Sequence, residues 1–258
     1  MNSLQDKVAL ITGAGRGIGR AISKKLAQRG MSIAINDIDL ELAQSAAREI
    51  EQIGRPAIAI PASVSDVNQV SAMFERVERE LGPLWLLVNN AGVLTTGPTV
   101  SLPEEAWDRA FDVDAKGVFL CSQAAIRAML PRKRGRIINI ASIAGLIVRT
   151  GQIGYCAAKA ATIHFTRCLA VELAPDGITV NCICPGMTWT EMLSKSAVER
   201  GLDLDAMVAL IPAGHMAQEE DHANLVGYFA SEEAAHVTGQ VVAVDGAQSL
   251  YHPLMVKP

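Results

Sequence analysis

The sequence predicts an α/β fold in which helices cover both faces of a parallel β-sheet. Seven short runs are almost continuously apolar and rich in β-branched residues, as strands buried on both faces must be. Longer amphipathic segments separate these runs, and such an alternation of strand and helix is typical of parallel sheets. The expected strands span residues 7–13, 32–37, 56–62, 84–92, 136–142, 178–186 and 240–246.

The first two helices are expected at residues 17–29 and 39–53, where apolar residues recur on one face. Gly30 and Gly54 follow these segments and provide the helix stops. The 258 residues suffice for one large α/β domain or two small ones, and half of them are hydrophobic. We find no linker, repeat or low-complexity tract that would divide the chain.

One long segment, residues 187–217, interrupts the alternation before the last helix. A core helix would explain part of its apolar content. A lid over a pocket explains both the length and the methionines, and we favour the lid. The apolar residues of this segment are Met187, Trp189, Met192, Leu193, Met207, Leu210, Ile211 and Met216.

Charge and composition argue against several classes of protein. The net charge is −4 and the densest basic run, residues 132–136, is short, so we interpret it as a helix-to-strand connector and expect no nucleic-acid partner. The N-terminus is short and polar, so we expect no signal peptide. The apolar runs are too short to span a bilayer, so we expect no membrane span. The five cysteines lack zinc-ligand spacing and are expected to be buried free thiols in a cytoplasmic protein. The histidines are scattered, and we expect no metal site.

A glycine-rich turn, "TGAGRGIG" at residues 12–19, joins the first strand to the first helix. Any tight turn favours glycine, but here the strand before and the helix after supply the context of a phosphate-binding turn. Missing side chains let the backbone approach a pyrophosphate, and the helix N-terminus offers N–H groups. We therefore expect a dinucleotide site at this turn.

The second strand ends at Asp37, 18 residues after Gly19. A carboxylate here is suited to both hydroxyls of an adenosine ribose and would repel a 2′-phosphate, which favours NAD over NADP. Arg16 argues for NADP, although we expect Asp37 to dominate because a desolvated acid beside a phosphate is costly. Asp37 could instead cap the next helix, a role for which Asp39 competes.

A phenol and an ammonium group lie four residues apart in "GYCAAKAA", at Tyr155 and Lys159. On a helix this spacing places both on one face. The two side chains could simply lie on a solvent-exposed face of the helix. Alternatively, the Lys159 cation lowers the pKa of Tyr155 so that the phenol exchanges protons near neutral pH.

These features together resemble the short-chain dehydrogenase/reductase family over about residues 5–248. The motifs are the glycine turn, "NNAG" at 89–92, Ser142, the Tyr155–Lys159 pair, "PGMTWT" at 185–190 and "VDG" at 244–246. The resemblance implies that residues 1–258 form a single Rossmann-like, doubly wound domain with a seven-stranded parallel sheet. It also implies a homotetramer or homodimer in which helices at 103–130 and 152–174 pair.

The resemblance implies catalytic roles for three residues. Tyr155 would be the acid/base, Lys159 would lower the pKa of Tyr155 and hold the nicotinamide ribose, and Ser142 would bind the substrate oxygen. Further cofactor-binding positions carried over from the family are Gly13, Arg16, Gly17, Ile18, Gly19, Asn90, Gly92, Pro185, Gly186, Thr188 and Thr190.

Two positions depart from the family pattern. Asp114 stands where the family usually has Asn in a proton relay to the lysine, so it is a catalytic candidate with an added negative charge. Ser63 stands where an Asp commonly precedes the Val whose backbone meets adenine, and we expect Ser63 and Val64 to keep that contact. Asp66 is expected to cap the following helix.

The resemblance therefore implies an oxidoreductase that transfers a hydride between NAD(H) and a secondary alcohol or ketone, with polyols as further candidate substrates. An NADPH-dependent 3-oxoacyl thioester reductase is the closest alternative and is favoured by Arg16. A catalytically inactive NAD-binding regulator is a second alternative, favoured only by Asp114.

Overall fold

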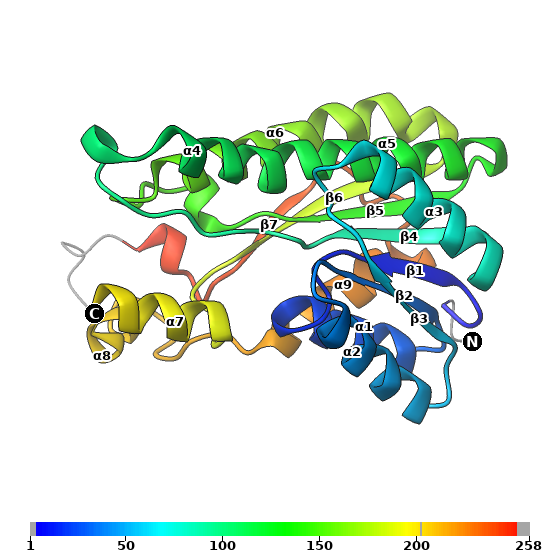
Figure 1. The fold of residues 1–258 in the computed structure, drawn as a ribbon, viewed down its shortest axis with the longest axis horizontal. Helices are drawn as coiled ribbons and strands as arrows, with labels where there is room; N and C mark the ends of the chain where they lie inside the picture. The colour runs from blue at the N-terminus through cyan, green and yellow to red at the C-terminus, as the bar shows by residue number, and fades with distance from the viewer. Residues whose placement is uncertain (1–3, 202, 252–258) are drawn as a thin grey trace.

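A seven-stranded parallel sheet forms the centre of the computed structural model, which describes residues 4–201 and 203–251 (Figure 1). The strand order is β3-β2-β1-β4-β5-β6-β7, so the expected α/β fold is confirmed. The strands are β1 (Val8–Ile11), β2 (Ser32–Asp37), β3 (Ala57–Pro61), β4 (Leu84–Asn89), β5 (Gly135–Ile140), β6 (Ile178–Pro185) and β7 (Val241–Val244).

Helices cover both faces of this sheet. Figure 1 shows α3 to α6 on one side and α1, α2 and α9 on the other, while α7 and α8 lie at one end. The bounds are α1 (Gly17–Gln28), α2 (Leu40–Gln52), α3 (Val67–Leu81), α4 (Glu104–Phe111), α5 (Gly117–Met129), α6 (Ile153–Leu173), α7 (Glu191–Arg200), α8 (Leu204–Val208) and α9 (Glu219–Phe229). No helix among the residues described is long and apolar enough to cross a membrane.

Local sequence signals set the helix ends as predicted. The Asp39 side chain caps α2 by accepting from the N–H groups of Glu41 and Leu42. Asp66 caps α3 in the same way. Gly30 and Gly54 follow α1 and α2 with positive φ angles of 91° and 83°, a backbone conformation that glycine adopts at low cost.

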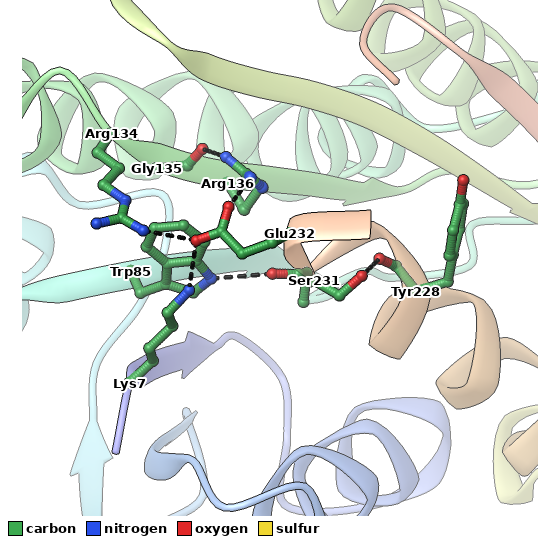
Figure 2. A network of polar contacts seen from close by, with 9 residues as sticks. Lys7, Trp85, Arg134, Gly135, Arg136, Tyr228, Ser231 and Glu232 are labelled. Atoms are coloured by element: carbon green, nitrogen blue, oxygen red, sulfur yellow. Dashed lines mark hydrogen bonds and ion pairs between the residues drawn. The ribbon is translucent and has the colours of Figure 1, made fainter. Parts of the chain in front are cut away.

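The basic run at residues 132–136 is the predicted connector, and it also belongs to a polar network at the amino-terminal edge of the sheet (Figure 2). The Glu232 carboxylate accepts from Lys7 at 3.0 Å, Arg134 at 2.6 Å and Arg136 at 3.1 Å. The Lys7 ammonium lies 3.3 Å from the centre of the Trp85 ring. The network ties the starts of β1, β4 and β5 to the segment after α9.

All five cysteines are free thiols, as expected, but only part of the burial prediction holds. Cys121, Cys182 and Cys184 are buried, whereas Cys168 is exposed on α6 and Cys156 is half-buried. Cys168 lies on the outer face of a helix whose other face packs on β6, so the sequence pattern did not distinguish its side from the buried one.

Residues 187–217 fold into α7, α8 and their connections. Met187, Ile211 and Met216 are buried in a small apolar cluster with partly buried neighbours on both helices. Trp189 and Leu210 are exposed, and the side chain of Met192 lies outside the described part. Packing within the segment therefore explains part of its apolar content, as the core-helix alternative required, while its action as a lid stays a prediction.

Candidate active site

The predicted site residues meet at the carboxyl ends of the strands, where the strand order reverses between β1 and β4. A cavity of about 580 Å³ lies there. Every predicted site residue lines it except Gly19 and Asp114, which lie behind its wall. Those lining it are Gly13, Arg16, Gly17, Ile18, Asp37, Ser63, Val64, Asn90, Gly92, Ser142, Tyr155, Lys159, Pro185, Gly186, Thr188 and Thr190.

The glycine turn has the backbone geometry of a phosphate cradle. Gly13 has a φ of 60°, and a Cβ there would lie 2.7 Å from the Ala91 Cα. A Cβ at Gly19 would lie 2.6 Å from the Gly13 carbonyl oxygen, so Gly19 lets α1 pack against the turn. No side chain in the described part of the chain caps the N-terminus of α1, where Gly17 and Ile18 line the cavity. Its N–H groups therefore fit an anionic pyrophosphate.

The Asn90 side chain holds this turn. Its amide donates to the carbonyl oxygens of Thr12 and Gly13, both at 2.9 Å. The Thr12 hydroxyl in turn accepts from the backbone N–H groups of Asn90 and Ala91. The sequence assigned Asn90 to the ribose of the cofactor. That contact stays a prediction, and the structure adds a positioning role.

Asp37 lines the cavity and does not cap α2, because Asp39 does so. Its Oδ2 accepts from the Gly15 N–H at 3.0 Å, and its Oδ1 accepts from the Asp39 N–H at 3.1 Å. A Cβ at Gly15 would lie 2.8 Å from Asp37 Oδ2, so glycine is required beside the carboxylate. The carboxylate is therefore fixed at the end of β2.

Two further residues near this end of the cavity are already engaged. The Arg16 guanidinium contacts the Glu191 carboxylate at 3.1 Å, in an exposed pair. The Ser63 hydroxyl lies 2.9 Å from the Ser65 hydroxyl. The exposed Arg16–Glu191 pair can open at small cost, since exposed ion pairs contribute little to stability. The contacts of Arg16 and Ser63 with a cofactor stay predictions.

The Tyr155–Lys159 pair lies on α6 as the spacing predicted, and it faces the cavity rather than solvent. The Lys159 ammonium lies 5.5 Å from the centre of the Tyr155 ring and donates to the Ile140 carbonyl oxygen at 3.2 Å. Ser142 follows β5, and its side chain lies close enough to the Tyr155 phenol to act on its pKa. The three side chains that the family resemblance marked as catalytic are thus brought together.

The pKa of Tyr155 differs from the sequence-based expectation. Burial raises the pKa of the phenol above its ordinary value, and Lys159 lowers it without offsetting the burial. The effect of Lys159 therefore has the expected sign, but the phenol stays protonated at neutral pH in the protein alone. The sequence could not reveal this because burial depends on the cavity wall.

Asp114 lies in a π-helical turn, Asp112–Lys116, between α4 and α5. Such turns are rare and frequently occur at functional sites. The carboxylate is fully buried, lies 3.2 Å from the Lys159 ammonium and accepts from the Val93 N–H at 3.2 Å. Burial raises the pKa of Asp114, and the lysine opposes that rise. Burial acts to lower the pKa of Lys159, but Asp114 and Tyr155 raise it above its ordinary value.

Thr188 has a buried partner that sequence reasoning missed. Its hydroxyl lies 2.8 Å from Nε2 of His222 on α9 and donates to the Gly186 carbonyl oxygen at 3.1 Å. With that hydrogen committed, Thr188 accepts from Nε2–H. His222 is fully buried, and its Nδ1 has no hydrogen-bond partner among the residues described. Only the packing of α9 against the loop after β6 reveals this pair.

Three polar residues of the cavity wall were not among the predicted site residues. Arg109 in α4 and Arg149 and Gln152 before α6 line the cavity beside Tyr155. Their only sequence signal is their closeness to Asp114 and Tyr155. His215 is exposed and is not part of the wall. Among the residues described, no group of three or more His, Cys, Asp or Glu could hold a metal ion.

The chain matches known proteins over nearly its whole length. The family model described as short chain dehydrogenase matches residues 7–201. The 3-oxoacyl-(acyl-carrier-protein) reductase FabG of Staphylococcus aureus is 39% identical over 93% of this chain and 97% of its own. The 2,3-dihydro-2,3-dihydroxybenzoate dehydrogenase of Bacillus subtilis is 37% identical over 96% and 97%. A variant of the actinorhodin polyketide ketoreductase, solved with NADPH, has a TM-score of 0.91 at 33% identity over 95% and 98%.

Proposed function

The chain belongs to the short chain dehydrogenase family and is an oxidoreductase with a nicotinamide cofactor, and we propose that it transfers a hydride between NAD(H) and a secondary alcohol or ketone. The observation that carries this proposal is the meeting of Ser142, Tyr155 and Lys159 at one wall of the cavity that the glycine turn also lines. A hydroxyl donor, a phenol and a cation at one point suit proton transfer to and from a carbonyl oxygen.

The glycine turn and the cavity wall would hold the nicotinamide cofactor, which would supply hydride transfer to or from the carbon that bears the substrate oxygen. In oxidation, ionised Tyr155 takes the hydroxyl proton as the C–O bond becomes a carbonyl. In reduction, protonated Tyr155 donates that proton to the oxygen. Ser142 donates a hydrogen bond to the same oxygen, and Lys159 favours the phenolate through its charge. The raised pKa of Tyr155 keeps the phenol in its protonated form at neutral pH, which is the form that ketone reduction needs.

The preference for NAD rests on Asp37. Its carboxylate lines the cavity and is fixed by two backbone N–H groups. A 2′-phosphate beside it would bring two negative charges together, which costs free energy in a partly desolvated site. Arg16 is the group best placed to offset that cost, and its guanidinium contacts Glu191 instead.

The alternative of an NADPH-dependent 3-oxoacyl thioester reductase has its own support. A relative with 39% identity carries that reductase name, and a similar structure was solved with NADPH. The exposed Arg16–Glu191 pair opens at small cost, so Arg16 is available to a phosphate. The inactive regulator has less support, because the Ser142, Tyr155 and Lys159 side chains are all in place.

The predicted assembly and location are kept as proposals. Phe119 on α5 and Val171 on α6 are exposed apolar side chains on the helices expected to pair. A homotetramer or homodimer would cover them, and light scattering after gel filtration would give the mass. The cytoplasmic location stays a prediction from composition.

The proposed function is tested by steady-state kinetics on ketones, secondary alcohols, polyols and an acyl thioester with each dinucleotide. Tyr155→Phe, which lacks only the phenol oxygen, is the blank. We expect NAD(H)-dependent turnover on at least one ketone or alcohol pair and its loss in the variant. Turnover with the acyl thioester and NADPH alone would favour the alternative. Dinucleotide binding without turnover of any compound would favour the regulator.

A further inference from the structure

A buried chain of hydrogen bonds lies behind the cavity wall after β6. Nε2 of His222 on α9 lies 2.8 Å from the Thr188 hydroxyl, and that hydroxyl donates to the Gly186 carbonyl oxygen at 3.1 Å. His222 is fully buried, whereas Thr188 is 6% exposed and lines the cavity together with Gly186. His222 therefore contacts the cavity wall through Thr188 and is not itself part of that wall.

The backbone fixes the position of Thr188 relative to α9. Thr188 pairs with Ala217 in an isolated parallel bridge. The Ala217 N–H donates to the Met187 carbonyl oxygen, and the Trp189 N–H donates to the Ala217 carbonyl oxygen, both at 3.0 Å. The helix α9 begins shortly after this bridge with a capping box. The hydrogen bond between His222 and Thr188 therefore joins two segments that are already held together.

The tautomer of His222 follows from its surroundings. Burial lowers the pKa of His222 to about 4, so the imidazole is neutral at neutral pH and carries one N–H hydrogen. Nδ1 has no hydrogen-bond partner among the residues described, and a buried N–H without an acceptor is costly. The hydrogen therefore lies on Nε2, which donates it to the Thr188 hydroxyl.

This tautomer determines what the Thr188 hydroxyl can bind in the cavity. A hydroxyl has one hydrogen and two acceptor sites. The hydrogen is donated to Gly186, and His222 occupies one of the acceptor sites. Towards the cavity, the Thr188 oxygen can therefore accept a hydrogen bond but has no hydrogen left to donate.

The sheet places Thr188 in the half of the molecule that carries Ser142. Thr188 follows β6, which lies next to β5, and Ser142 follows β5. Asp37 ends β2, on the other side of the point where the strand order reverses. A dinucleotide with its adenosine at Asp37 and its nicotinamide at Ser142 would bring its carboxamide, rather than its adenine amine, to the side of Thr188.

We propose that His222 is a positioning residue for the cofactor, which fixes the Thr188 hydroxyl as an acceptor for the NH2 group of the nicotinamide carboxamide. The inference rests on the proposed function, which puts a nicotinamide in this cavity. The carboxamide is a substituent of the nicotinamide ring, so holding it orients the ring towards the substrate. Without His222, the Thr188 hydroxyl can turn its hydrogen towards the cavity, where it would oppose the NH2 donor.

A matched pair of dinucleotides tests this contact without requiring turnover. NADH and its 3-acetylpyridine analogue, in which a methyl group replaces the carboxamide NH2, are titrated into the protein in a calorimeter. We expect the wild-type protein to bind NADH about tenfold more tightly than the analogue. In His222→Leu, which removes both ring nitrogens, this ratio should fall below about threefold. In His222→Gln, which keeps a donor for Thr188, the ratio should stay near the wild-type value.

Thr188→Val is the second variant, since it removes the hydroxyl and keeps the shape of the side chain. The ratio should fall as far as in His222→Leu, and combining the two substitutions should lower it no further, because both act through one hydroxyl. Val226→Ala, which opens a gap in the core one turn further along α9, is the control and should leave the ratio unchanged. ADP-ribose, which lacks the nicotinamide ring, should bind equally to all of these proteins.

The outcomes separate the positioning role of His222 from the proposed reaction. An unchanged ratio in His222→Leu, or an equal loss of affinity for NADH, the analogue and ADP-ribose, would overturn the positioning role even where ketones are reduced. A ratio that falls in His222→Leu and returns in His222→Gln, without turnover of any ketone or alcohol, would support the positioning role and overturn the proposed reaction. A wild-type protein that binds neither NADH nor NADPH would overturn both.

Discussion

The Asp114 carboxylate lies 3.2 Å from the Lys159 ammonium, and both side chains are almost completely shielded from solvent. The π-helical turn that carries Asp114 places this charge directly behind the cavity wall. The Thr162 hydroxyl donates to the Asp114 carbonyl oxygen at 2.6 Å, which satisfies a backbone group of that turn. Because Lys159 faces Tyr155 from the same helix, the electrostatics of the phenol depend on both partners.

Asp114→Asn tests the role of this buried charge. We expect kcat to stay within about tenfold of the wild-type value, since the amide keeps an acceptor for the Val93 N–H. Asp114 raises the pKa of Tyr155, so its neutralisation lowers that pKa. The pH midpoint of alcohol oxidation, which needs the phenolate, therefore moves to lower pH. A loss in kcat beyond tenfold would show that the carboxylate has a catalytic role of its own.

Asp37→Ser tests the discrimination between dinucleotides. Removing the carboxylate is expected to lower kcat/KM for NADH by about tenfold, because the ribose hydroxyls lose their acceptor. It is expected to raise kcat/KM for NADPH by about tenfold, because repulsion of the 2′-phosphate is lost. Asp39→Ser is the matched control, since Asp39 caps α2 and serine also caps well. An unchanged preference in Asp37→Ser would show that another group selects the cofactor.

His222 is expected to make the protein sensitive to acid. Burial lowers the pKa of His222 to about 4 from an ordinary value of 6.5, and the Asp221 charge opposes the shift only weakly. Because the unfolded chain takes up this proton at a higher pH than the folded protein, neutral His222 stabilises the fold above pH 6.5. This part of the free energy of unfolding, about 3 kcal/mol, is lost as the pH falls from 6.5 through 4. Denaturant unfolding between pH 7 and 4 measures the loss. His222→Gln keeps a donor for Thr188 but cannot take up the proton, so its loss should be smaller; an equal loss would assign the sensitivity to other groups.

Glu232→Gln tests the network at the amino-terminal edge of the sheet. The substitution leaves the almost fully buried Arg136 beside Lys7 and Arg134 without their common carboxylate (Figure 2). We expect the free energy of unfolding to fall by about 2 kcal/mol, less than for a fully buried pair because Glu232 is partly exposed. Glu80→Gln removes a carboxylate from an exposed helix face and is the control. Equal stability of the two variants would contradict a structural role for the network.

Much of the fold could be predicted because buried parallel strands have a simple sequence signature. The strand predicted at residues 84–92 is longer than β4, which ends at Asn89. The difference arises because Asn90 to Gly92 form a turn against Thr12 and Gly13. The π-helical turn could not be predicted, since one extra residue per turn over Asp112–Lys116 leaves the apolar periodicity nearly unchanged.

The candidate site could likewise be predicted only in part. Local motifs predicted the residues that the chain brings to the cavity from the ends of successive strands. Arg149 and the His222–Thr188 pair carry no such motif, because their placement depends on how a loop and α9 pack against the site. The direction of the Tyr155 pKa could not be predicted from spacing either, since burial outweighs the neighbouring charge.

The proposed function is tested most directly by the rate of ketone reduction with NADH and with NADPH, measured for the wild-type protein and for Tyr155→Phe. We predict turnover with a higher kcat/KM for NADH than for NADPH, and its loss in the variant although NADH still binds. Unchanged turnover in Tyr155→Phe would contradict the assignment of the phenol as the acid/base. Turnover only with NADPH would contradict the proposal that Asp37 selects NAD over NADP, and it would favour the thioester reductase.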